Sequence, residues 1–111
     1  MEVVLKKLIN YETSTGKCPV RAWLDELDSV VSARIQARIR RITYGNFGDA
    51  KSVGQGVSEL RITFGSGYRV YFARYGEEII LLLCGGDKAS QVQDIQTAQN
   101  YWLDFKRRIN V

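Results

Sequence analysis

The stretch ELRITFGSGYRVYFA at residues 59–73 decides the fold. Apolar and polar residues alternate on both sides of the small segment Gly65–Gly67. Alternation with period two is the pattern of a half-buried β-strand, and a short glycine-containing segment between two such runs is typical of a hairpin. We therefore expect two antiparallel strands here, with one face against a core and the other toward solvent.

The flanking sequence adds further strands. Residues 79–84 form an unbroken apolar run, which indicates a central strand that ends at Gly85-Gly86. Residues 2–9 contain enough apolar groups for another strand. Residues 45–56 carry four glycines and no periodicity, so we expect a loop there.

Three segments have helical spacing. The first is expected to begin at Pro19, whose missing N–H is tolerated in the first turn of a helix. The second has Asp28 or Ser29 as its cap and Gly45 at its end, and the last follows a capping-box residue at Ser90. Apolar residues at helical spacing are expected to face the core: Val20, Trp23, Leu24 and Leu27; Val31, Ile35, Ile39 and Ile42; Val92, Ile95, Ala98, Trp102 and Phe105.

The predicted order is strand, two helices, three strands and a last helix. This order indicates an α+β fold: a small, mainly antiparallel sheet with an N-terminal helical hairpin and a C-terminal helix. The length of 111 residues predicts a single domain over residues 1–111. No apolar run is long enough to span a bilayer, and the first residues lack the layout of a signal peptide, so we expect a cytoplasmic protein without a membrane partner.

The positive charge is concentrated in one part of the chain. The formal net charge is +4, but residues 34–74 hold eight basic residues against two acidic ones. Such a stretch favours a polyanionic partner, either RNA or an acidic protein, although a solvated surface explains it equally well. The chain has no His and two cysteines, Cys18 and Cys84, so we expect no metal site and no cofactor.

The hairpin provides the most specific candidate site. With a three-residue loop, Phe64 pairs with Tyr68, and Arg61, Arg69 and Tyr71 share one face. Arg61 and Arg69 are then diagonal neighbours, about 7–8 Å apart at Cβ. Two guanidinium groups this close could grip one phosphate, and the tyrosine could stack on a base. The alternative is the wet face of an ordinary hairpin.

Other basic residues extend this candidate site. Arg34, Arg38 and Arg41 lie at i, i+4 and i+7 on the second helix, as a stripe opposite its core face. Lys51 belongs to the same basic stretch. Lys88 follows the last strand and precedes the last helix, where a lysine beside helix N–H groups favours an anion. Each of these residues has an alternative reading as ordinary surface.

Several motifs in order resemble one known family. They are GVSELRI at residues 56–62, GSGYRVYF at 65–72, LLCGGDK at 82–88, Ser90-Gln91 and Asp94-Ile95. Together they resemble the addiction-module killer proteins, also called phage Gp49-like or HigB-like toxins, within the RelE/ParE superfamily. The similarity extends over nearly the whole chain.

The resemblance implies a RelE-like fold and the toxin of a type II toxin–antitoxin system. RelE- and HigB-type members cleave mRNA in the ribosomal A site, which implies a metal-independent endoribonuclease with Arg61, Arg69 and Lys88 at the scissile phosphate. The charge pattern and the hairpin geometry, and not the family motifs, add Arg34, Arg38, Arg41, Lys51 and Tyr71 as the expected RNA-binding residues. The implied partners are mRNA, the ribosome and a cognate antitoxin with a helix-turn-helix domain. The alternatives are a ParE-like DNA gyrase poison, or a non-toxic nucleic-acid-binding phage-type protein.

Overall fold

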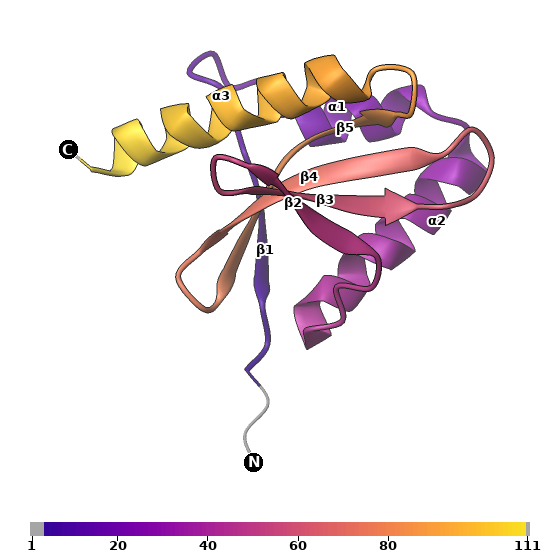
Figure 1. Cartoon of the computed structure of the whole chain (residues 1–111), viewed down its shortest axis with the longest axis horizontal. Coiled ribbons are helices and arrows are strands. Elements are labelled where there is room, and N and C mark those ends of the chain that lie inside the picture. Colours follow the sequence, from indigo (N-terminus) through magenta and orange to yellow (C-terminus); the bar gives the residue numbers. More distant parts are fainter. Residues whose placement is uncertain (1–3, 111) are drawn as a thin grey trace.

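The computed structural model describes residues 4–110, and it is an α+β protein built on one five-stranded sheet (Figure 1). The strands lie in the order β1-β5-β4-β3-β2. All neighbours are antiparallel except β1 and β5, which are parallel. The predicted fold class is confirmed. The elements are β1 (Lys7–Asn10), α1 (Pro19–Glu26), α2 (Ser29–Arg40), the 3₁₀ helix η1 (Arg41–Tyr44), β2 (Ala50–Gly54), β3 (Val57–Ile62), β4 (Tyr68–Tyr75), β5 (Ile79–Asp87) and α3 (Gln91–Ile109).

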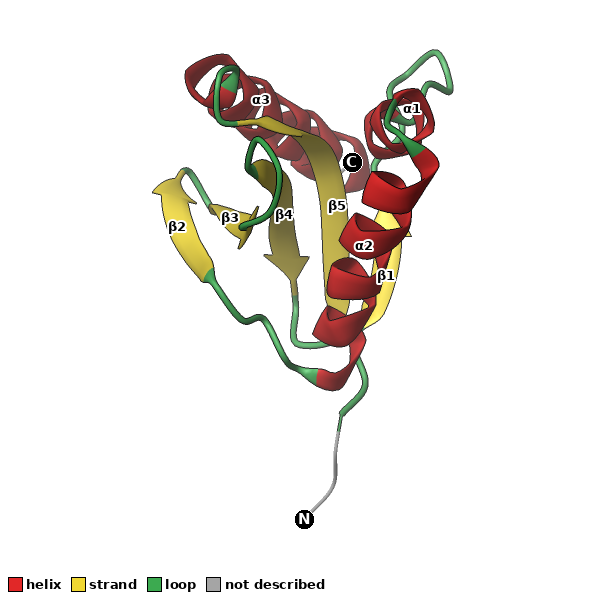
Figure 2. Ribbon diagram, turned by 90° about the vertical axis from the view of Figure 1, so that its right-hand side faces the viewer, coloured by secondary structure: helices red, strands yellow, loops and turns green. Residues whose placement is uncertain are grey.

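Helices cover both faces of the sheet. Figure 2 shows α3 on one side and α1 with α2 on the other. Alternation along β3 and β4 sends one set of side chains to each helical layer. The core on the α1/α2 side includes Ile35, Ile39, Leu60, Val70, Phe72 and Leu82. The core on the α3 side includes Tyr11, Val57, Tyr71, Leu81, Leu83, Ala98 and Trp102.

The covered second face corrects one expectation. We predicted that the hairpin turns one face to solvent, but α3 packs over most of that face. Arg61 and Arg69 continue this face beyond the buried residues Tyr71 and Glu59. The open end of the sheet is therefore small, and it lies next to the start of α3.

Outside the hairpin, the predicted strands differ from the observed ones at three places. Residues 45–56 contain the edge strand β2, which was predicted as a loop. The first strand is Lys7–Asn10 rather than 2–9, and residues 2–3 of that prediction lie outside the described part of the chain. Gly85-Gly86 does not end β5, because the strand continues to Asp87.

The two glycines are needed inside β5 because other groups approach the backbone there. A Cβ at Gly85 would clash with the ring of Trp23, and a Cβ at Gly86 would clash with the carboxylate of Asp94. These glycines therefore let α1 and α3 pack closely on the strand.

The helix ends follow the predicted chemistry in part. The carboxylate of Asp28 caps α2 by accepting from the N–H groups of Val30 and Val31. Ser90 directly precedes α3, but its hydroxyl donates to Asp87 and Asp94 and does not cap the helix. Val92 was predicted to be buried, and it is 85% exposed. Within residues 4–110, no helix has the length and apolar character needed to cross a membrane.

Candidate nucleic-acid interface

Arg61 and Arg69 lie directly opposite each other on β3 and β4. The predicted register was wrong by two residues, because Ile62 and not Phe64 pairs with Tyr68. Phe64 lies in a longer loop between the strands, where its ring packs 5.4 Å from that of Tyr68. A shift of two keeps every side chain on its predicted face. The two arginines therefore share a face, as expected, and are closer neighbours than the predicted diagonal pair.

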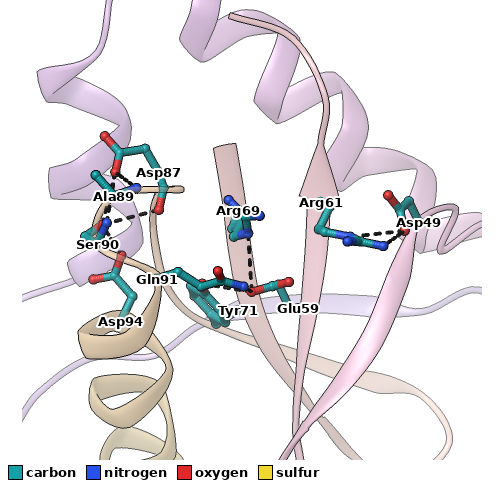
Figure 3. A network of polar contacts seen from close by, with 10 residues as sticks. All are labelled: Asp49, Glu59, Arg61, Arg69, Tyr71, Asp87, Ala89, Ser90, Gln91 and Asp94. Carbon is teal, nitrogen blue, oxygen red and sulfur yellow. Dashed lines mark hydrogen bonds and ion pairs between the residues drawn. The ribbon is translucent and has the colours of Figure 1, made fainter. Parts of the chain in front are cut away.

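The side chain of Arg61 is turned away from Arg69 (Figure 3). Its Nη2 lies 3.0 Å from Oδ1 of Asp49, and its Nε lies 3.3 Å from the same oxygen. The two side chains are 39% and 48% exposed. An exposed pair of this kind contributes little stability, so a phosphate group could displace Asp49 at small cost.

Arg69 has a different environment, because it belongs to a buried polar network (Figure 3). Its Nε lies 3.5 Å from Oε2 of Glu59, and the side chains are 13% and 0% exposed. The same oxygen accepts hydrogen bonds from the hydroxyl of Tyr71, at 3.1 Å, and from Nε2 of Gln91, at 2.9 Å. This network joins β3, β4 and the first residue of α3.

Tyr71 lies inside the protein and not on a wet face. Its side chain is fully buried under α3, so the prediction that it is exposed for stacking on a base is wrong. Burial raises the pKa of the Tyr71 hydroxyl far above its ordinary value, and the negative charge of Glu59 raises it further. The hydroxyl is therefore a fixed hydrogen-bond donor at neutral pH.

Lys88 lies at the same end of the sheet as Arg69. Arg69 is paired with Gly86 on β5, and the backbone N–H of Lys88 donates to the carbonyl of Gly67 at 3.1 Å. The Lys88 side chain is exposed. The positive end of the α3 dipole begins three residues later, at Gln91. The three predicted catalytic residues are thus gathered at one end of the sheet.

Both arginines line a shallow depression of about 210 Å³. It is open to solvent and combines two cations with one carboxylate at its rim. Its size suits a phosphate group better than a drug-sized molecule, which needs about 300–1,000 Å³. The depression is lined by Asp49, Arg61, Ile62, Thr63, Gly67, Tyr68 and Arg69.

Lys51 joins this face, whereas the arginines of α2 do not. Lys51 is exposed on β2 and is paired with Glu59, which places it on the face of Arg61 and Arg69. The helix α2 covers the opposite face of the sheet. The basic residues that were predicted to bind RNA are therefore divided between the two faces of the sheet.

The three arginines of the α2 stripe have different surroundings. Arg34 is exposed and lies over the ring of Phe64 at 5.1 Å. Arg38 is half-buried and donates to the carbonyl of Phe47 at 3.3 Å, so it fixes the chain after η1. Arg41 is exposed at the start of η1. Arg34 is the one of these three that reaches the β3–β4 loop beside the depression.

Sequence reasoning missed Glu59 and Gln91. Glu59 lies between Val57 and Arg61 on one face of β3, so its inward direction follows from the strand pattern. Its burial depends on the position of α3, which the strand pattern does not contain. The sequence did contain one signal of this buried pair: Glu59 is an acidic residue on the inward face of a strand, and the neighbouring strand carries Arg69 on the same face.

The described residues offer little other reactive chemistry. Burial, with a contribution from Asp94, raises the pKa of the Cys84 thiol to about 12. In the described part of the chain, no three His, Cys, Asp or Glu side chains lie close enough together to hold a metal ion. The end of the sheet combines the cations of Arg61 and Arg69 with the carboxylate of Asp49, which is paired with Arg61.

The fold and this site define a class: a small α+β protein with an architecture consistent with the RelE-like fold and a cationic sheet end. Residues 22–102 match the family described as "Phage derived protein Gp49-like (DUF891)", and the chain belongs to this family. A Haemophilus influenzae protein described as "Uncharacterized protein" is 49% identical over 79 residues, which cover 70% of this chain and 80% of the relative. The matched segment in the family comparison contains Arg61, Arg69, Lys88, Glu59 and Gln91.

Proposed function

We propose that this protein is the toxin of a type II toxin–antitoxin pair and cuts mRNA on the ribosome without a metal ion. The observation that carries the proposal is the direct opposition of Arg61 and Arg69 beside Lys88, at an open end of the sheet. Membership of the phage-derived Gp49-like family supports it, because the sequence motifs of this chain resemble addiction-module killer proteins of that kind.

The proposed reaction is an internal transesterification of RNA. The ribose 2′-oxygen forms a bond to the adjacent phosphorus, and the bond from phosphorus to the 5′-oxygen of the next nucleotide breaks. The proton of the 2′-hydroxyl is lost, and the departing 5′-oxygen gains one. The products are a 2′,3′-cyclic phosphate and a free 5′-hydroxyl, so atoms and charge balance without a cofactor.

The protein contributes charge and orientation to this reaction. Arg61 exchanges Asp49 for a phosphoryl oxygen, and Arg69 approaches the same group from the paired strand. Lys88 adds a third cation or donates a proton to the leaving oxygen. Loss of one such preorganised group is worth on the order of 10²–10³ in rate.

Partners follow from this proposal. A free toxin must be neutralised, so we expect a cognate antitoxin, of the helix-turn-helix type, encoded next to it. The toxin would act in the cytoplasm, where translating ribosomes are found. An acidic antitoxin segment near residues 34–74 would associate at a rate that falls with salt.

The test is primer extension on translated mRNA after induction of the toxin in cells. Cuts at discrete codons, absent with Arg61→Ala at matched expression, are the expected result. Double-strand DNA breaks or relaxed plasmid without mRNA cuts would identify a gyrase poison instead. Normal growth with neither signal would indicate a non-toxic nucleic-acid-binding protein.

A further inference from the structure

We propose that Glu59 and Gln91 are positioning residues, which fix the guanidinium of Arg69 for the phosphate of the RNA. Neither residue was among the predicted site residues. The kinetic part of this inference rests on the proposed nuclease function. The structural part, that these two residues immobilise Arg69, does not.

The burial of Glu59 carries the argument. A carboxylate with no exposed surface is costly unless donors compensate its charge. Two hydrogen bonds reach Oε2, from Tyr71 and Gln91, and Nε of Arg69 forms an ion pair with the same oxygen at 3.5 Å without a hydrogen bond. Within residues 4–110, Oε1 has no hydrogen-bond partner. Such an arrangement is poor as a device for stability alone, because an apolar residue of similar volume would avoid the cost.

The charge of Glu59 also acts against simple anion binding. A negative group 3.5 Å from Arg69 weakens the attraction of that guanidinium for any phosphate. A site selected for affinity alone would therefore lack it. A site that must hold a guanidinium in one orientation gains from it, because a planar fork grips a phosphate only when it is aligned.

The connections of Glu59 explain which orientation is fixed. The carboxylate lies on β3, Arg69 lies on β4, and Gln91 is the first residue of α3. Rigid elements therefore hold the network from three directions, as a site placed to sub-ångström tolerance requires. Arg61 lacks this support, because its partner Asp49 is exposed and lies in the segment before β2.

Glu59 acts through Arg69 and not on the RNA itself. Its side chain has 0% exposure, whereas Arg69 retains 13%. We therefore assign the contact with phosphate to Arg69 and the orientation of that contact to Glu59 and Gln91.

The decisive variant is Glu59→Gln, which keeps the size of the side chain and removes its charge. The matched control is Glu26→Gln, an equal charge change at an exposed position at the end of α1. In nitrogen-detected NMR, the Nε–H of Arg69 should exchange with water at least 10-fold faster in Glu59→Gln. The Nε–H of Arg61 should be unchanged, and Glu26→Gln should match the wild type at both arginines.

The kinetic arm uses programmed ribosomes and a non-cleavable 2′-deoxy oligonucleotide. Glu59→Gln should bind the oligonucleotide as tightly as the wild type or more tightly, because a negative charge is gone. Its single-turnover cleavage on ribosomes should fall about 10–100-fold. A merely structural role would lower binding and cleavage together, in proportion to the loss of folded protein.

A second variant keeps the proposal testable if Glu59→Gln does not fold. Gln91→Ala removes one neutral donor and leaves the carboxylate, with Gln96→Ala on the exposed side of α3 as its control. It should accelerate Arg69 exchange in the same direction by a smaller factor. An unchanged Arg69 signal in both folded variants overturns the positioning role. If Arg69 exchanges faster in the variants as expected but the wild type never cuts RNA, only the nuclease proposal is overturned.

Discussion

At the scale of single residues, Arg61 and Arg69 are the same amino acid on the same face, yet their surroundings separate them. Arg61 is paired with an exposed carboxylate, and Arg69 is paired with a buried one. An exposed pair stabilises the fold by about 0–1 kcal/mol, whereas removal of one partner from a buried pair leaves the other charge buried without a partner. The two substitutions to alanine should therefore differ in stability even if both remove activity.

Arg61→Ala should lower ribosome-dependent cleavage about 10²–10³-fold, because one preorganised cation is lost from the phosphate. It should change the free energy of unfolding by less than about 1 kcal/mol, since its partner Asp49 stays in water. Urea denaturation and single-turnover cleavage of the same preparation check both values. Full activity in the stable variant would remove Arg61 from the site.

Arg69→Ala should destabilise the protein as well as inactivate it. The variant leaves Glu59 buried without its cation, and breaking a buried pair costs on the order of 3–5 kcal/mol. The double variant Arg69→Ala with Glu59→Gln should recover part of that stability and remain inactive. Urea denaturation of the single and double variants measures the recovery. A single variant as stable as the wild type would show that Glu59 does not depend on Arg69.

At the scale of elements, the sequence predicted the strands and helices that have a strong apolar period. The helices α1, α2 and α3 and the strands β3, β4 and β5 are where the pattern placed them, within a few residues. The edge strand β2 was missed because only Ala50 and Val53 among its residues are partly buried. Its identity as a strand comes from pairing with β3, which is a tertiary property.

The candidate site was also predictable only in part: the sequence indicated on which face its side chains lie, but not which of them are buried. The shared face of Arg61 and Arg69 follows from period two, and it survives a register error of two residues. The burial of Tyr71 and Glu59 was not predictable from that period, because α3 supplies the cover from a distant part of the sequence. Local pattern therefore gave the direction of these side chains, and the packing of α3 decided which of them meet solvent.

A contact between distant elements makes the protein sensitive to alkaline pH. The hydroxyl of Tyr11 donates to Oδ2 of Asp104 on α3 at 2.6 Å, and the ring is 3% exposed. Burial, followed by the hydrogen bond to Asp104 and its charge, raises the pKa of Tyr11 from 10.0 to about 12. The folded state thus binds this proton more tightly than the unfolded chain does.

The sign of the pH effect follows from that shift. The stabilisation is fully present below pH 10 and is lost as the pH rises from 10 through about 12. Tyr11→Phe should lose less stability than the wild type over this interval, because it has no such proton. Urea denaturation at pH 9 and pH 11.5 measures how the free energy of unfolding changes with pH in each protein. The raised pKa of Tyr71 contributes equally to both slopes, because both proteins contain Tyr71. Equal slopes would contradict the link between Tyr11 and Asp104.

At the scale of the whole molecule, positive charge is distributed over two faces of the sheet. Arg61, Arg69 and Lys51 lie on the α3 face at its open end, while Arg34 on α2 and Arg41 at the start of η1 lie on the other side. A single RNA strand that reaches the depression would contact the first group directly. The second group is free for another polyanion, and ribosomal RNA around the A site would provide one under the proposed function.

The distribution of reactive groups gives the last prediction, which concerns dependence on the ribosome. The chain has no His, and the hydroxyl of Tyr71 is buried with a raised pKa. The cations of the site bind phosphate well and transfer protons poorly at neutral pH, and its exposed carboxylate, Asp49, is paired with Arg61. Such a site depends on a substrate that is already held in a near-attack geometry, and on the proposed function the ribosome supplies that geometry.

The purified protein should therefore bind naked RNA weakly, with an affinity that falls steeply as salt is raised. It should cut that RNA slowly or not at all, with or without EDTA. Addition of ribosomes programmed with mRNA and an open A site should produce cuts at discrete codons, and Arg61→Ala on the same ribosomes provides the control. Efficient cutting of naked RNA would remove the ribosome from the mechanism, because the protein alone would then orient the 2′-hydroxyl. Binding to DNA gyrase without any RNA cleavage would show that the cations form a docking surface. Their arrangement at the sheet end would then serve to bind gyrase and not to break a bond in RNA.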